Sequence, residues 1–227
     1  MQESITDTLR GYDTCTLADA LAKLNLQAHS QGYSGPGLHC FTSSCSPVAG
    51  YAATARIRAA DAPVTGHHFF RHSEWWSRIE TLPEPRIVVI EDMDREPGSG
   101  ACLGQVGAAL FQALKCVAAV TNGAVRDVDT VDSMGFALFA AHVTPSRAYA
   151  HMIDHGQPVE IFALPIHSGD LLVADRHGLI AIPLEHASEV CARAAEVRSQ
   201  KKKFIDFCRS PRFSLDDLDP QLKELQI

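Results

Sequence analysis

Val117-Ala118-Ala119-Val120-Thr121 is followed at once by Asn122-Gly123-Ala124-Val125-Arg126-Asp127, and a helical pattern begins near Val128. The first five residues form a short apolar run, which is typical of a buried strand. The Asn-Gly pair predicts a sharp turn after that strand. A strand that turns directly into a helix is the building unit of α/β proteins, so this stretch predicts a sheet with helices packed on it.

The same alternation continues toward both ends of the chain. Before this stretch we expect strands at 49–59 and 86–91, and helices at 67–80, at 105–115 and from Thr16, which serves as the cap. After it we expect a strand at 136–143, short strands at 148–153, 158–163, 171–174 and 179–182, and a long helix at 184–207. Arg176-His177-Gly178 predicts a hairpin turn. The fold class is therefore mixed, layered α/β, with a β-rich second half and a long C-terminal helix.

Length and charge limit the function classes. The 227 residues fit a single domain, 1–227, with a polar C-terminal tail at 209–227 that holds at most a last helical turn. The formal net charge of -7 predicts no nucleic-acid binding, which needs an excess of Lys and Arg. The basic run Lys201-Lys202-Lys203 lies in a helical segment and is predicted to be a solvated helix face.

The seven cysteines are scattered and odd in number, which predicts free thiols and a cytoplasmic location. The first residues lack the apolar core of a secretion signal. No apolar run approaches the roughly 20 residues that cross a bilayer, so we expect no membrane segment.

The sequence gives little support for a zinc site or for several common catalytic motifs. Cys40 and Cys45 form one pair with no second pair at zinc-site spacing. His68 and His72 are four apart in a predicted helix, but no glutamate follows His68 as a zinc protease requires. Gly98-Ser99-Gly100 is more simply a turn than part of a phosphate loop. No nucleophile elbow, Walker loop or dinucleotide-binding glycine motif occurs.

Arg126 and Asp127 carry the strongest local signal. They lie beyond the carboxyl end of a predicted strand, where α/β sheets tend to bind ligands. The guanidinium is a planar fork that suits a carboxylate or an oxo acid, and the carboxylate offers oxygen ligands for magnesium or manganese. The alternative is an ordinary turn arginine and an aspartate that favours the first turn of a helix. Local chemistry leaves both interpretations open.

Gly104-Gln105 and, further on, Gly123-Ala124-Val125-Arg126-Asp127 together resemble the signature of the RraA-like family. That family includes aldolases for 4-hydroxy-4-methyl-2-oxoglutarate and 4-carboxy-4-hydroxy-2-oxoadipate, and RNase E inhibitors. Further similarity is found in the segments 16–21, 48–50, 134–140 and 166–178, so that the resemblance covers roughly residues 10–200 in order.

The resemblance implies an α/β/α sandwich that assembles as a homotrimer or homohexamer. It also implies a divalent metal, Mg²⁺ or Mn²⁺, held by Asp127 largely through waters. Arg126 would contact the same ligand oxygen, and backbone N–H groups of Gly104, Gln105, Val106 and Gly107 would hold the substrate carboxylate. The implied reaction is retro-aldol cleavage of a 4-hydroxy-2-oxo acid to pyruvate, and the same chemistry allows decarboxylation of oxaloacetate.

Gln105 departs from the aldolase pattern, in which an acidic residue at that position helps to order a water molecule. An amide hydrogen-bonds water but cannot accept its proton. Three readings therefore stay open: a metal-dependent lyase, a regulatory binding protein like the RNase inhibitors, or a catalytically silent homologue. Asp127 argues against the inhibitor branch, where the residue after the arginine is not acidic.

Overall fold

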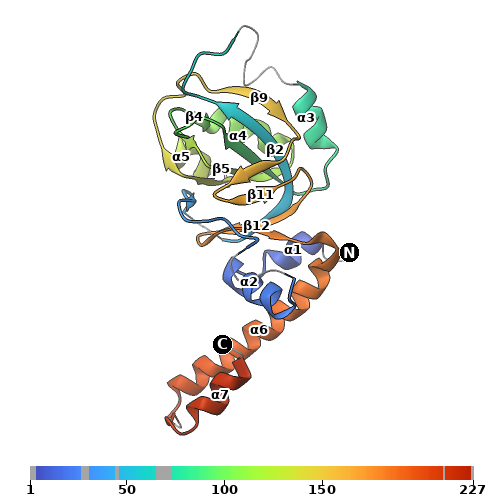
Figure 1. Ribbon diagram of the computed structural model, residues 1–227, viewed down its shortest axis with the longest axis vertical. Coiled ribbons are helices and arrows are strands. Elements are labelled where there is room, and N and C mark those ends of the chain that lie inside the picture. Colours follow the sequence, from blue (N-terminus) through green and yellow to red (C-terminus); the bar gives the residue numbers. More distant parts are fainter. Residues whose placement is uncertain (1–3, 27–30, 44–45, 65–72, 212, 226–227) are drawn as a thin grey trace.

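A curled, nearly closed mixed sheet of eight strands forms the centre of the fold (Figure 1). The computed structural model describes residues 4–26, 31–43, 46–64, 73–211 and 213–225. Strands β7, β5, β3 and β2 are parallel, and their neighbours β1, β9, β12 and β13 run antiparallel to them or to each other. The bounds are β1 (His39–Cys40), β2 (Val48–Arg58), β3 (Arg86–Asp92), β5 (Cys116–Thr121), β7 (Ala137–Ala140), β9 (His151–His155), β12 (Leu171–Asp175) and β13 (Gly178–Ile182).

The long strand β2 joins the two halves of this sheet. Its residues 48–51 pair with β12, whereas residues 55–58 pair with β9, and β3 lies along its other edge. The register shifts between Arg56 and Ile57, which is the mark of a bulge, and bulges increase the local twist of a strand. One strand thus serves two antiparallel neighbours in succession as the sheet curls.

Alternate residues of β2 face different cores, as the period of two in a strand requires. Ala53 and Ala55 point to the outer face, where they pack with α3 (Ser73–Glu80), α4 (Gln105–Ala113) and α5 (Val128–Ser133). Ala52 points to the inner face. There the hairpin of β10 (Val159–Ile161) and β11 (Leu164–Ile166) fills the curl of the sheet.

A second group of helices covers β12 and β13. Helices α1 (Ile5–Leu9), α2 (Thr14–Lys23) and the first half of α6 (Ala187–Arg209) bury Leu17, Leu21 and Val190 against these strands. A short 3₁₀ turn, η1 (Leu184–His186), precedes α6. Because the sheet curls, the two helical groups lie on different sides of it (Figure 1). The far half of α6 projects from the body as an arm, and α7 (Leu218–Leu225) folds back along it.

A small parallel sheet extends the fold beside α4 and α5. It consists of β4 (Ala101–Leu103), β6 (Ala124–Val125) and β8 (His142–Val143), in the order β4-β6-β8. Strand β6 follows Asn122-Gly123, so the chain does not turn straight from β5 into a helix as the sequence predicted. This short strand displaces the next two residues, Arg126 and Asp127, from the edge of the main sheet to the edge of the small one.

The mixed α/β class, the β-rich second half and the long C-terminal helix are confirmed, as is the hairpin predicted at 176–178, although Gly178 already belongs to β13. The predicted cap Thr16 is wrong. Asp13 caps α2, because its Oδ1 accepts the backbone N–H of Thr16 at 2.7 Å and its Oδ2 accepts the Thr16 hydroxyl at 3.1 Å. The predicted strand 136–143 divides into β7 and β8, and β1, β4, β6, β11, α1 and α7 were missed.

Other predictions have mixed outcomes. The predicted helix 105–115 ends at Ala113, and Lys115 takes a left-handed conformation with a φ of 57°. Of the predicted helix 67–80, the structure describes α3 from Ser73, and His68, His72 and Cys45 lie outside the described residues. Every cysteine that lies in the described ranges is a free thiol. None of the helices described there is long and apolar enough to span a membrane.

Candidate functional site

Asp127 occupies the N-cap position of α5 without capping that helix. Its φ of 57° is left-handed, a conformation that Asp tolerates better than most residues but that still stores strain. Its carboxylate oxygen Oδ2 accepts the backbone N–H of Gln105, the first residue of α4, at 3.1 Å. The aspartate therefore does not behave as an ordinary helix-start residue, because its side chain serves α4, which begins 22 residues earlier in the chain.

Arg126 is fixed through its backbone and reaches toward the same carboxylate. Its N–H donates to the carbonyl of Leu103 at 2.9 Å, which continues the pairing of β4 with β6. Its Nε lies 3.6 Å from Oδ2 of Asp127, and its Nη1 donates to the carbonyl of Pro145 at 3.4 Å. The two side chains are 34% and 27% exposed, so they form neither a buried pair nor a fully solvated one. A ligand has access to both.

Gly104 allows this close approach. A Cβ at this residue would lie 2.5 Å from Oδ2 of Asp127 and 2.9 Å from Cγ of Arg126. The backbone itself is extended, with a φ of -148°, so the glycine is explained by space and not by conformation. It also leaves the start of α4 without a capping side chain. The first N–H groups of a helix have no partner within the helix, and together they favour an anion.

The predicted site residues differ in what they contribute. The structure brings Gly104, Gln105, Arg126 and Asp127 together at the start of α4. Val106 is 69% exposed, and only its backbone N–H was predicted to bind a ligand. Gly107 is buried, and a Cβ there would lie 2.5 Å from Leu103 Cδ1, which explains this glycine by helix packing.

Asp127 is the one predicted metal ligand at this site. In the described part of the chain, no three or more His, Cys, Asp or Glu side chains converge in a way that could hold a metal ion. Asp127 Oδ2 is engaged by Gln105, and no described residue donates a hydrogen bond to Oδ1. One available carboxylate oxygen fits Mg²⁺, which keeps several waters and needs only one or two carboxylates. It does not fit zinc, which requires three or four protein ligands.

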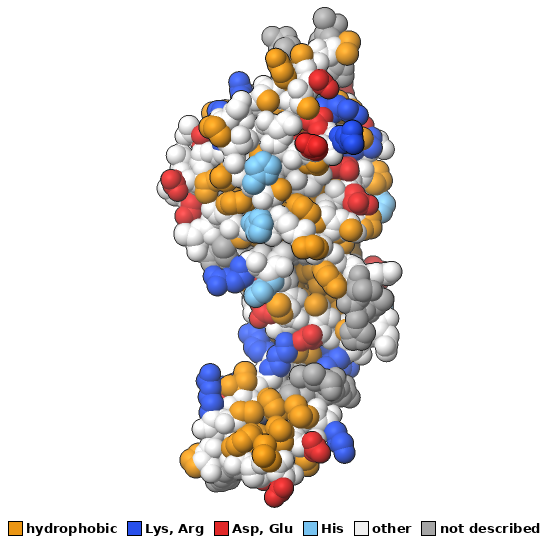
Figure 2. Space-filling view, turned by 60° about the vertical axis from the view of Figure 1, so that its left-hand side comes forward, with side chains coloured by type: hydrophobic (Ala, Val, Ile, Leu, Met, Phe, Trp, Pro, Cys, Tyr) orange, Lys and Arg blue, Asp and Glu red, His pale blue; other side chains and the backbone are white. Residues whose placement is uncertain are grey.

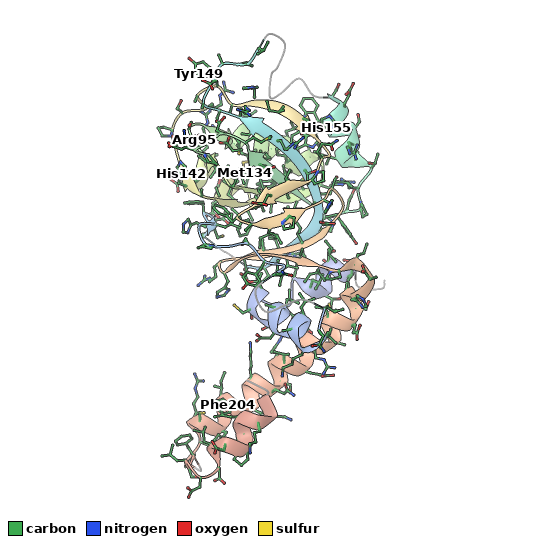
Figure 3. All side chains as sticks on the ribbon, in the orientation of Figure 1. Arg95, Met134, His142, Tyr149, His155 and Phe204 are labelled. Carbon is green, nitrogen blue, oxygen red and sulfur yellow. The ribbon has the colours of Figure 1, made fainter. Side chains whose placement is uncertain are left out.

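The loop after β3 supplies polar residues that the sequence did not single out. Asp92, which is 2% exposed, accepts the backbone N–H groups of Asp94 and Gly98, and burial raises the pKa of its carboxyl group. His142 Nε2 lies 3.2 Å from the Gly98 carbonyl, and Figure 3 shows His142 and Arg95 on the same side of the body. These contacts confirm that Gly98-Ser99-Gly100 is a turn. In the sequence, the signal for these contacts is an aspartate, Asp92, directly before a segment that contains Gly98 and Gly100.

Arg126 also has a partner that no local pattern could indicate. Pro145 follows β8, and its carbonyl reaches the guanidinium only because β6 and β8 pair side by side.

Comparisons with known proteins agree with this fold. Protein DlpA of Legionella pneumophila is 23% identical over 129 residues, which are 55% of this chain but only 20% of that protein. An uncharacterized protein from Pseudomonas syringae pv. tomato superimposes with a TM-score of 0.75 at 23% identity, over 98% of this chain and 94% of that one. RraAS2 of Streptomyces coelicolor, described as an unusual member of the RNase ES inhibitor RraA family, gives a TM-score of 0.67 at 20% identity, over 89% of this chain and 95% of that one.

Identities this low show only a shared fold. The family model is stronger, because it matches residues 14–181, which include every element from α2 to β12 and both halves of the Gly104–Asp127 site. The chain therefore belongs to the RraA-like (Aldolase/RraA) family.

Proposed function

We propose that this protein is a divalent-metal-dependent lyase that cleaves a 4-hydroxy-2-oxo acid to pyruvate and decarboxylates oxaloacetate by the same route. One observation carries the proposal. The Asp127 carboxylate turns away from its own helix to the start of α4, beside the Arg126 guanidinium, in a space that Gly104 keeps open. An anion site, a metal-binding oxygen and a delocalised positive charge thus adjoin one another.

Each group has a role in binding. The N–H groups of Val106 and Gly107, in the first turn of α4, would hold the substrate carboxylate. Asp127 Oδ1 would hold Mg²⁺ or Mn²⁺, with waters completing its coordination. The bound cation would supply positive charge next to the 2-oxo group. The Arg126 fork would donate to the same oxo oxygen and orient it.

In the cleavage, the bond between C3 and C4 of the substrate breaks. The C4 hydroxyl gives its proton to a water molecule and becomes a carbonyl, and the electron pair of the broken bond passes to the oxo acid, which leaves as the enolate of pyruvate. Arg126 stabilises the negative oxygen that develops, which is commonly the largest single contribution to such a reaction. Water then protonates C3. In oxaloacetate, carbon dioxide leaves in place of the aldehyde or ketone.

Gln105 favours a second candidate, a protein that binds an oxo acid without turnover. Its side chain is exposed at the start of α4, where an amide can hold a water molecule but cannot take the hydroxyl proton. A regulator of the RNase-inhibitor type is a further alternative, and Asp127 speaks against it because the resemblance gives that branch no acid at this position.

We also propose a homotrimer or homohexamer. Support comes from the arm of α6 and α7, where hydrophobic side chains gather on one face (Figure 2). Ile205, Phe213 and Leu215 are 45%, 43% and 75% exposed. Large exposed apolar patches are typical of protein interfaces. Sedimentation of the purified protein tests this assembly, and a monomer at all concentrations would refute it. The cytoplasmic location expected from the cysteines stays a prediction.

The deciding experiment measures pyruvate release from oxaloacetate and a panel of 4-hydroxy-2-oxo acids, with Mg²⁺ or Mn²⁺ and with excess chelator. We expect metal-dependent release that Arg126→Ala and Asp127→Ala abolish. Asp129→Ala is the matched control, since it removes an exposed carboxylate two residues away. Release that persists in chelator would refute the metal. Metal binding without release would favour the non-catalytic candidate.

A further inference from the structure

A hollow lies on another part of the molecule, between α3 and the end of β9. Its volume is about 710 Å³, within the range of about 300–1,000 Å³ that is usual for small-molecule sites. Four hydroxyl side chains and two nitrogen-bearing side chains line it: Ser73, Ser77, Thr81, Ser168, Arg78 and His155. None of these residues belongs to the site at Gly104 and Asp127. Figure 3 shows His155 beside α3, on the opposite edge of the view from His142.

Arg78 brings an uncompensated positive charge to this hollow. No residue in the described part of the chain forms an ion pair or hydrogen bond with its guanidinium. The side chain lies directly over Gly156, where a Cβ would be 2.5 Å from Arg78 Nε and 2.6 Å from Cζ. Any other residue at position 156 would push the guanidinium away, so the backbone after β9 receives this arginine.

His155 contributes a buried nitrogen without a partner. It is the last residue of β9 and pairs with Ala55 of β2, which directs its side chain to the outer face of the sheet, toward α3. Its Nδ1 is buried and has no hydrogen-bond partner among the described residues. Buried polar atoms in folded proteins nearly always have a partner, and a bound ligand is one way to supply it.

We propose that this hollow binds one anionic group, a carboxylate or a phosphate, carried by a small metabolite. Arginine presents a planar fork that pairs with either group through two parallel hydrogen bonds. The imidazole and the hydroxyl groups add further donors around it. Glu74, the one acidic side chain among the described residues of the lining, disfavours a ligand with many negative charges. The site is independent of the proposed lyase chemistry.

Calorimetric titration of the full chain with inorganic phosphate and, separately, with acetate tests the proposal. We expect saturable binding of at least one probe, and the pair distinguishes a phosphate site from a carboxylate site. Arg78→Gln should weaken that binding roughly 10- to 100-fold, because a charge-assisted hydrogen bond is lost. Arg176→Gln is the matched control, since Arg176 is an exposed arginine of the β12–β13 turn and should leave binding unchanged.

Two further measurements keep the result clear. Arg78 is exposed, so Arg78→Gln should unfold at the wild-type temperature, and the NMR signals of the His155 imidazole should move on addition of the probe in the wild type but not in this variant. Asp127→Ala should bind the probe as the wild type does. Absence of saturable binding at millimolar probe, equal binding by Arg78→Gln, or loss of binding in Asp127→Ala would each overturn the inference.

Discussion

Gly104→Ala is the most direct test of the candidate site, because it adds a single methyl group between the functional side chains. The new Cβ would lie 2.5 Å from Asp127 Oδ2, 2.9 Å from Arg126 Cγ and 3.2 Å from Arg126 Nε. Ordinary contact begins at 3.4 Å, so the carboxylate has to retreat by about 0.9 Å. That movement separates Oδ2 from the Gln105 N–H, which it accepts at 3.1 Å.

The change in stability should be small, since two effects oppose each other. Alanine reduces the freedom of the unfolded chain and stabilises by about 0.4–1 kcal/mol, because Gly104 has an extended backbone that alanine adopts easily. Overpacking costs about 1–3 kcal/mol, and here the lower end applies because the displaced side chains are partly exposed. We therefore expect a loss of no more than about 2 kcal/mol in the free energy of unfolding.

Function should suffer more than stability. A misplacement of about 1 Å in a reacting group can cost about 10²-fold in rate, so metal-dependent pyruvate release should fall by about that factor. The assay couples released pyruvate to lactate dehydrogenase and is accompanied by metal titration calorimetry and thermal unfolding. Gly11→Ala is the control, because its Cβ would meet only the Thr8 carbonyl, at 3.1 Å. Wild-type release and metal affinity in a folded Gly104→Ala variant would refute the proposed site.

Three further predictions concern other residues. Gln105→Asp should raise aldol cleavage, by up to about 10²-fold, because it restores a group able to take a proton, and pyruvate release measures it; an unchanged rate would mean that the base lies elsewhere. Asp175→Ala should lower the free energy of unfolding by at least about 2 kcal/mol, because the buried N–H and hydroxyl groups of Thr14 lose their acceptor, as does the N–H of His177, and chemical denaturation measures the loss. Burial raises the pKa of Cys102 and of Cys116 to about 12, so at pH 8 roughly one thiol in ten thousand is ionised, and mass mapping should find both unmodified by a thiol reagent that labels exposed Cys208 in the native protein. Rapid labelling of Cys102 or Cys116 would contradict their burial.

Sequence periodicity predicted most of the main sheet, whereas of the small sheet it covered only β8, as the end of one predicted strand at 136–143. Strand β2 alternates clearly, and β3 and β5 contain unbroken apolar runs of four and five residues, which are visible without any tertiary information. Strands β4, β6 and β8 have only two or three residues each. Such segments carry no period of their own, and they become strands only because parallel neighbours are brought beside them.

The helix starts show a similar limit. Both Asp13 and Thr16 are good capping residues, and the sequence favoured Thr16 because an apolar stripe follows it. The structure uses Asp13, whose carboxylate accepts two hydrogen bonds from Thr16, while Thr14 is drawn to the buried carboxylate of Asp175 from the other end of the chain. That long-range contact fixes where α2 begins, and no local rule contains it.

The choice between a helix-start aspartate and a site aspartate at position 127 follows from the same cause. A capping aspartate has an extended backbone and turns its carboxylate onto its own helix. At Asp127 the small sheet intervenes: β6 pairs with β4, the Arg126 N–H is held by Leu103, and the next residue must take a positive φ to enter α5. That reversal carries the carboxylate over Gly104 to α4. A strained, non-capping aspartate persists only where its surroundings hold it, and here the same hydrogen bonds that hold it also place it beside the proposed anion site, so strain and proposed site have one structural origin.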